Sequence, residues 1–160
     1  MNNNLVKKIL ISLGLIILLI TVDQWSKLLA VDRLMNDSPF TVIENILKFE
    51  YVENPGAAFS SFLNERTFLC IVTVVALIVF SYYLVKCEDR FSLVGLILVI
   101  GGAIGNFIDR IRVSYVIDFI SFSFFSPVFN LADVFLTVGV AIIVIVLLKD
   151  TTTALKKDSE

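Results

Sequence analysis

Residues 130–148 read NLADVFLTVGVAIIVIVLL, an apolar run that carries a single carboxylate, Asp133, near its start. A helix rises about 1.5 Å per residue, so about 20 apolar residues cross the roughly 30 Å of bilayer hydrocarbon. Three further runs of this kind precede it, at residues 9–31, 67–85 and 91–108. The chain is therefore predicted to be an all-α membrane protein with four transmembrane helices, folded as one membrane-embedded domain over residues 1–160.

Composition supports this class and excludes others. Hydrophobic residues make up 58% of the chain and the mean hydropathy is +0.91, whereas soluble domains are about 45–50% apolar. The chain has no histidine, which excludes histidine-based triads and most zinc sites. Cys70 and Cys87 lie near opposite ends of one predicted helix and are too far apart to pair. No metal or cofactor is predicted, and no basic cluster indicates a nucleic acid partner.

Charge distribution predicts the orientation. The short segments that flank the spans on one side carry lysine and arginine and should be cytoplasmic, together with both termini: Lys7, Lys8, Lys86, Arg90, Lys149, Lys156 and Lys157. Residues 32–66 hold six acidic and three basic residues and should lie outside, with the connection 110–128. Partial alternation predicts short strands at 41–43, 46–49 and 50–52, with a turn at Glu44-Asn45. They would form a small extracytoplasmic sheet that ends at Asn54-Pro55-Gly56.

Two aspartates occur where a membrane protein should avoid them. Asp118 lies between Ile117 and Phe119, and Asp133 follows Asn130 at the start of the last span. A carboxylate in hydrocarbon costs about 2.5 to 3.5 kcal/mol on insertion scales. Desolvation should raise the pKa of Asp118, whereas a helix N-terminus, capped by Asn130, favours an ionised Asp133. Two carboxyls that share a proton can act as base and acid, so this pair indicates an aspartic hydrolase, although Asp133 alone could be an ordinary first-turn acid.

Other polar residues accompany the third and first spans. Asn106, Asp109 and Arg110 are three and four residues apart and should share an interior side of the helix, where they could position substrate or the aspartates. Gly101 and Gly105 should permit close helix packing. Asp23 and Lys27 form an i, i+4 pair that either neutralises itself or has a functional role. Gly56 can bring its backbone close to an extended peptide, although the same residues suit an ordinary loop turn.

These motifs together resemble the five signature blocks of bacterial lipoprotein signal peptidase, also called signal peptidase II, in the family's order. The blocks are Asp23-Gln24-x-x-Lys27, Asn54-x-Gly56-Ala57-Ala58-Phe59, Gly101-Gly102-Ala103-x-Gly105-Asn106-x-x-Asp109-Arg110, Val116-x-Asp118-Phe119 and Phe129-Asn130-x-Ala132-Asp133. Ser121, often acidic in the family, and Val134, often serine, depart from it. Neither departure affects the aspartates.

The resemblance implies a membrane aspartic endopeptidase with an extracytoplasmic sheet cradle, located in the bacterial cell membrane with its active site near the outer face. It would cleave the signal peptide from prolipoproteins on the N-terminal side of a diacylglyceryl-modified cysteine. Asp118 and Asp133 match the catalytic pair, and Asp23 matches a supporting acid, with Lys27 and Asp109 beside it. Globomycin-type inhibitors and membrane lipid are the other expected partners. The polar residues around the site would be Asn54, Gly56, Asn106, Arg110 and Asn130.

Two other classes compete with this interpretation. Intramembrane acids also serve proton-conducting subunits and small transporters, but a relay needs acids spread through the membrane depth, and here they cluster at one face. A non-catalytic scaffold could instead pair the acids with Lys27 and Arg110. Substitution of Asp118 by Asn discriminates these classes, because only an enzyme loses turnover while it keeps its fold.

Overall fold

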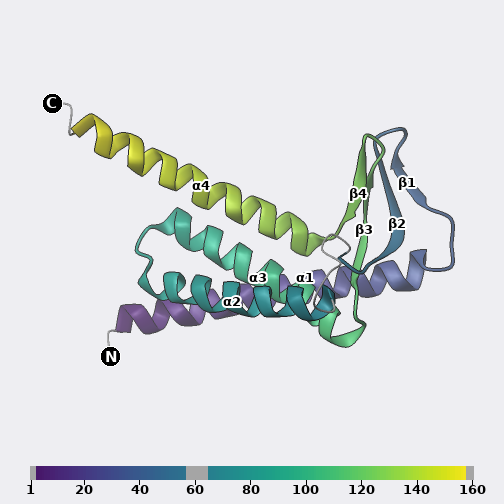
Figure 1. Cartoon of the computed structure of the whole chain (residues 1–160), viewed down its shortest axis with the longest axis horizontal. Helices are drawn as coiled ribbons and strands as arrows, with labels where there is room; N and C mark the ends of the chain where they lie inside the picture. The colour runs from purple at the N-terminus through teal and green to yellow at the C-terminus, as the bar shows by residue number, and fades with distance from the viewer. Residues whose placement is uncertain (1–2, 57–64, 158–160) are drawn as a thin grey trace.

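The computed structural model of the chain describes residues 3–56 and 65–157, in which four long helices carry a small sheet at one end (Figure 1). The helices are α1 (Asn3–Leu34), α2 (Glu65–Lys86), α3 (Arg90–Arg112) and α4 (Leu131–Lys157). All four are long and apolar enough to cross a membrane. The predicted fold class is confirmed. Each helix is longer than the apolar run that predicted it, because polar residues extend the helical hydrogen bonding at both ends of α1, α2 and α3 and at the C-terminal end of α4.

Helix α3 is the centre of the bundle. Half of its most apolar window is buried, against 6–11% for the other three helices. Leu96, Ile97 and Ile100 of α3 form the buried core with Ile16 of α1 and Leu84 of α2. The remaining helices expose large apolar side chains, among them Leu18, Ile78 and Ile145. Apolar side chains that face outward all round a bundle are stable only in hydrocarbon, so the bilayer covers these faces.

Close packing around α3 depends on its glycines. A side chain at Gly101 would collide with Leu19 of α1, and one at Gly105 would collide with Asp23 of α1. The prediction that these two glycines permit close helix approach is therefore correct. Gly95 and Gly139 form a second close crossing, between α3 and α4, which the sequence analysis did not identify. These contacts bring both α1 and α4 close against α3.

The sheet has four antiparallel strands in the order β1-β2-β3-β4. They are β1 (Phe40–Ile43), β2 (Leu47–Asn54), β3 (Val116–Phe122) and β4 (Phe125–Phe129). The predicted strand at 41–43 is present, and Asn45 makes the turn with a φ of 59°. The segments 46–49 and 50–52 are one strand, not two, because a register shift between Phe49 and Val52 absorbs the irregularity that separated them. Strand β2 ends at Asn54, as predicted.

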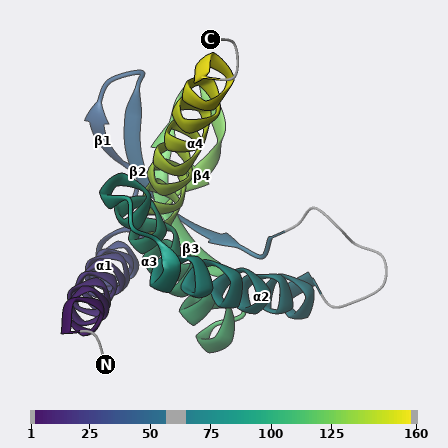
Figure 2. The same ribbon diagram turned by 90° about the vertical axis from the view of Figure 1, so that its left-hand side faces the viewer.

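Strands β3 and β4 were not predicted. Residues 116–129 are rich in apolar residues and alternate only over 120–124, a stretch too short to define two strands, and β2, the partner of β3, lies far away in sequence. The pairing of β2 with β3 joins the 32–66 segment to the 110–128 connection, which places both at the same end of the bundle. Figure 1 shows the two chain ends at the opposite end, and Figure 2 looks along the bundle from that side.

Candidate active site

Asp118 and Asp133 approach each other from different elements at the junction of sheet and bundle. Asp118 lies in β3 and is 1% exposed, and Asp133 is half-buried in the first turn of α4. Asn130 caps this helix as predicted, because its Oδ1 accepts the Asp133 backbone N–H at 3.0 Å. The Asp133 carboxylate in turn accepts the Asn130 backbone N–H at 3.1 Å. This reciprocal pair is a capping box, and it fixes the Asp133 carboxylate relative to Asn130.

Two side-chain amides connect the carboxylates. The Asn130 Nδ2 group donates to Asp118 Oδ1 at 2.6 Å and to Asn106 Oδ1 at 3.0 Å. The Asn106 Nδ2 group then donates to Asp133 Oδ1 at 2.8 Å. Asn130 is fully buried and Asn106 nearly so. The two aspartates are thus the ends of one continuous hydrogen-bonded network through two amides.

A third amide reaches Asp118 from the sheet. Asn54, at the end of β2, donates from Nδ2 to Asp118 Oδ2 at 2.8 Å. Its Oδ1 accepts the backbone N–H of Gly56 at 2.9 Å, which turns the amide so that its donor points at the carboxylate. Gly56 has a φ of +85° and packs against Leu69 of α2, a backbone conformation that favours glycine. The predicted motif continues through Ala57, Ala58 and Phe59, which lie outside the described residues.

The environment of Asp118 perturbs its acidity. Burial raises the pKa of this carboxyl to about 6, and the negative charge of Asp133 adds to the increase. Hydrogen bonds from Asn54 and Asn130 and the positive charge of Lys27 oppose it. Desolvation is the largest contribution because it penalises the charged form. With a pKa of about 6, Asp118 is protonated in a minority of molecules at neutral pH and can take up and release a proton beside a second carboxyl, which suits acid–base catalysis by a pair.

A cavity of about 290 Å³ opens beside Asp133 between α2, α3 and α4. We refer to it as the dyad cavity. Asn106 and Arg110 form its polar wall with Asp133. Its other lining residues are mostly apolar: Val72, Thr73, Ala76, Phe80, Val99, Ala103 and Leu136. The space suits an apolar chain whose polar group meets Asp133.

The residues predicted to share one side of α3 divide between two sides. Arg110 faces the dyad cavity, and its guanidinium donates to the Asn106 backbone carbonyl at 3.4 Å. Asp109 instead points toward α1 and does not line that cavity. Asp109 shares Lys27 with Asn106, so these two lie on one interior side as predicted. Asp109 and Arg110 do not, because residues adjacent on a helix project about 100° apart.

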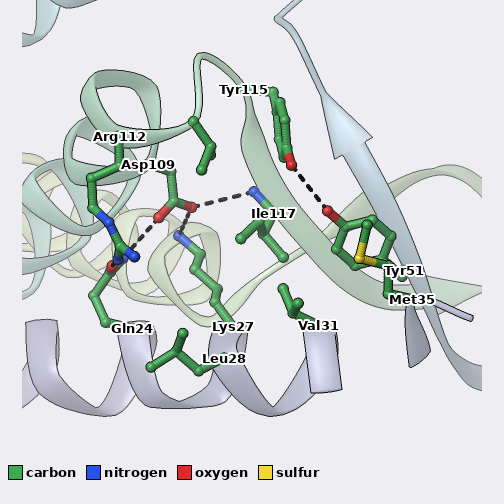
Figure 3. Close-up of a pocket in the computed structure, with 11 residues that line it drawn as sticks. Gln24, Lys27, Leu28, Val31, Met35, Tyr51, Asp109, Arg112, Tyr115 and Ile117 are labelled. Carbon is green, nitrogen blue, oxygen red and sulfur yellow. Dashed lines mark hydrogen bonds and ion pairs between the residues drawn. The ribbon is translucent and has the colours of Figure 1, made fainter. Parts of the chain in front are cut away.

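Asp23 and Lys27 form the predicted pair, and Asp109 joins them. Lys27 Nζ lies 2.9 Å from Asp23 Oδ2 and 2.8 Å from Asp109 Oδ2, and all three side chains are buried. Figure 3 shows Asp109 between Lys27, the Gln24 side chain and the Ile117 backbone N–H. Gln24 was not predicted to contribute. It donates to both Asp23 and Asp109, and its place beside Asp23 in an apolar span was the available signal.

The same group borders a second pocket of about 280 Å³, which we call the α1 pocket. It lies between the C-terminal end of α1, α3 and the sheet (Figure 3). Ser121, one of the two family departures, is buried and hydrogen-bonded to Glu50. Among the described residues, no group of three His, Cys, Asp or Glu side chains is arranged to hold a metal ion. The α1 pocket is lined by Gln24, Lys27, Leu28, Val31, Met35, Tyr51, Asp109, Arg112, Val113, Tyr115 and Ile117.

Comparisons with known proteins agree on one family. The family model described as "Signal peptidase (SPase) II" matches residues 15–149. A lipoprotein signal peptidase of Caldanaerobacter subterraneus is 45% identical over 122 residues, which cover 76% of this chain and 84% of that protein. One from Clostridium tetani is 39% identical over 142 residues, covering 85% and 91%. A solved structure of a bacterial membrane enzyme superposes with a TM-score of 0.80 at 35% identity, covering 87% of this chain and 93% of the other.

Proposed function

This chain belongs to the signal peptidase II family, and from this premise we infer that it cleaves the signal peptide from prolipoproteins by aspartic catalysis. Membership makes it a peptidase, and its four apolar helices make it a multi-pass membrane protein. The scissile bond would lie on the N-terminal side of a diacylglyceryl-modified cysteine. Residues 1–160 would form a single peptidase domain. The observation that carries the aspartic mechanism is the amide network that joins Asp118 to Asp133.

The catalytic roles follow from the different surroundings of the two carboxyls. Asp133 lies at a helix N-terminus, which stabilises an ionised carboxylate, whereas burial favours a protonated Asp118. The ionised carboxylate would accept a proton from a water molecule as its oxygen attacks the scissile carbonyl carbon. The protonated carboxyl would stabilise the developing oxyanion and a proton would finally pass to the leaving amine.

Substrate positioning is assigned to the polar residues around the pair. Asn106 and Arg110 line the dyad cavity beside Asp133 and could hold carbonyl groups of the cleaved strip. The apolar wall of the cavity could accept the signal helix, which would enter sideways from the bilayer. Asn54 and Gly56, at the end of β2, would contact the extended strip, and Asn130 would hold Asp118. Asp23, Lys27 and Asp109 would support the site without contacting substrate.

The substrate's lipid would fix the depth of the cleavage site. A diacylglyceryl group anchors the cysteine at the membrane boundary, because each buried methylene contributes about 0.8 kcal/mol. The sheet end of the bundle would then be extracytoplasmic, with both termini in the cytoplasm. Globomycin-type inhibitors would occupy the same cavity. A proton-relay function is not favoured, since the buried charged residues that the structure describes, Asp23, Lys27, Asp109 and Asp118, gather at the sheet end.

A cleavage assay with two matched precursors tests this function. The purified protein in micelles is given a diacylglyceryl-modified prolipoprotein and the same precursor with its target cysteine replaced by serine, which cannot be modified. We expect cleavage of the lipidated precursor immediately before the modified cysteine, read by mass spectrometry, and a rate on the serine form lower by about 100-fold or more, since anchoring supplies most of the productive placement. Equal rates on the two precursors would leave only a general intramembrane aspartic protease.

A further inference from the structure

Lys27 uses each of its three ammonium protons on a different acceptor. Its Nζ lies 2.9 Å from Asp23 Oδ2, 2.8 Å from Asp109 Oδ2 and 2.9 Å from Asn106 Oδ1. The residue is 1% exposed. An ammonium has three donors and no acceptor, so this side chain is saturated by protein groups. The acceptors come from α1 and from two positions of α3.

Two of these acceptors, Asp23 and Asp109, also hold the residue before one of the two catalytic aspartates. Asp23 Oδ1 accepts the backbone N–H of Ala132, the residue before Asp133, at 2.9 Å. Asp109 Oδ2 accepts the backbone N–H of Ile117, the residue before Asp118, at 3.2 Å. The two carboxylates paired with Lys27 therefore tether the chain immediately before each catalytic residue. The Asp109 tether holds strand β3, and the Asp23 tether holds helix α4.

The third contact decides the orientation of the Asn106 amide. With Oδ1 on the Lys27 ammonium, Nδ2 points at Asp133 and donates to it. A flipped amide would place two donors face to face at Lys27 and an oxygen against the Asp133 carboxylate, which is unfavourable at both ends. The same Oδ1 accepts from Asn130 Nδ2, which also holds Asp118. Lys27 thus sets the direction of the whole network between the aspartates.

We propose that Lys27 is the positioning residue of the aspartate pair: one ammonium that fixes β3 at Asp118, α4 at Asp133 and the amide between them. This proposal rests on the catalytic assignment made above. If Lys27 served only to neutralise buried charge, it would need fewer contacts, because Asp23 alone, one helical turn away, would compensate its charge. Neutralisation does not require the contact with Asn106, nor that both carboxylates hold the residues before the aspartates. Lys27 itself does not line the dyad cavity, so it acts through these neighbours.

The α1 pocket makes the proposal testable by chemical rescue. Lys27, Gln24 and Asp109 line this pocket (Figure 3), which lies against a different face of α3 from the dyad cavity. Lys27→Ala would remove the three carbons and the nitrogen that n-propylammonium contains. The pocket's volume of about 280 Å³ admits that ion. An added amine could therefore restore the ammonium without entering the substrate's cavity.

The experiment measures kcat and KM on the lipidated precursor for the wild type, Lys27→Met and Lys27→Ala. We expect kcat to fall about 100-fold in both variants with KM changed less than about threefold, because a misplacement of about 1 Å costs this much in rate. n-Propylammonium should restore Lys27→Ala at least about tenfold, and 1-propanol, its neutral counterpart, should not. Lys8→Met is the matched control, since Lys8 donates to the Val85 and Cys87 carbonyls at the other end of α1.

The outcomes separate this proposal from the function on which it rests. An inactive wild type would refute the proposed function. An active wild type with Lys27→Met at wild-type kcat, or equal rescue by 1-propanol, would refute only the positioning role. Removal of one partner of a buried ion pair can prevent folding, so the triple variant Asp23→Asn/Lys27→Met/Asp109→Asn, with no unpaired buried charge, is measured as well. A folded triple variant with reduced kcat supports the proposal, and one with wild-type kcat contradicts it.

Discussion

Ionisation of Asp118 should make the folded protein less stable as the pH rises, and Asp118→Asn should remove this effect. Burial raises the pKa of Asp118 from 3.8 to about 6. Between these values the native state binds more protons than the unfolded state, so the free energy of unfolding of the wild type falls with increasing pH. Below pH 3.8 the carboxyl is protonated in both states and the penalty is absent. The penalty approaches its full size about one pH unit above the folded-state pKa.

The size of the effect follows from the shift. A displacement from 3.8 to about 6, at about 1.36 kcal/mol per unit, corresponds to about 3 kcal/mol. Asp118 is 1% exposed, so solvent does not screen this value appreciably. Asn54 and Asn130 each donate a hydrogen bond to one oxygen of Asp118. An asparagine at this position cannot accept both bonds in the same way, and this loss lowers the stability of the variant by a constant amount at every pH. The difference in unfolding free energy, variant minus wild type, should therefore increase by about 2.4 kcal/mol from pH 4 to pH 7, since a small part of the penalty is already present at pH 4.

Chemical unfolding in micelles at several pH values measures this difference. Asp89→Asn is a control of opposite sign, since hydrogen bonds from Ser92 at the start of α3 lower the pKa of Asp89. Its contribution to wild-type stability should be lost as the pH falls. A difference between wild type and Asp118→Asn that does not change from pH 4 to pH 7 would refute the reasoning about the buried carboxyl.

Three further predictions address the surroundings of the site. Gly56→Val should reduce cleavage about tenfold or more, because it strains a left-handed residue and displaces the Asn54 amide; a rate equal to wild type would contradict this. Reporters fused after Lys86 should read cytoplasmic and those within residues 37–44 extracytoplasmic, and a cytoplasmic reading within 37–44 would put the site on the wrong face. Chelators should leave the cleavage rate unchanged, since two carboxyls suffice for the acid–base steps, and inhibition that added metal reverses would contradict the two-carboxyl mechanism.

Local signals in the sequence predicted the parts of the fold that local physics determines. The four helices follow from apolar runs that match the bilayer thickness. The capping box of Asn130 and Asp133 follows from the spacing of two residues at the start of one helix. The turn at Asn45 and the end of β2 at Asn54 also depend on neighbouring residues only.

The unpredicted parts depend on contacts between distant segments. Strands β3 and β4 alternate only over residues 120–124, and β3 is defined by its pairing with β2. The side of α3 taken by Asp109 is decided by Lys27 on α1 and by the Ile117 backbone. The bridge from Asn130 to Asp118 likewise joins α4 to β3. The sequence could identify these polar residues by their unfavourable positions, but their partners became known only from the three-dimensional structure.

Cleavage of the lipidated precursor by purified Asp118→Asn and Asp133→Asn tests the central claim most directly. The two carboxyls act as a unit, so each variant should retain less than about a tenth of the wild-type rate. Both variants should keep a cooperative unfolding transition and bind the precursor, which shows that the loss is in catalysis. Retention of more than about a tenth of the activity by either folded variant would contradict catalysis by this pair.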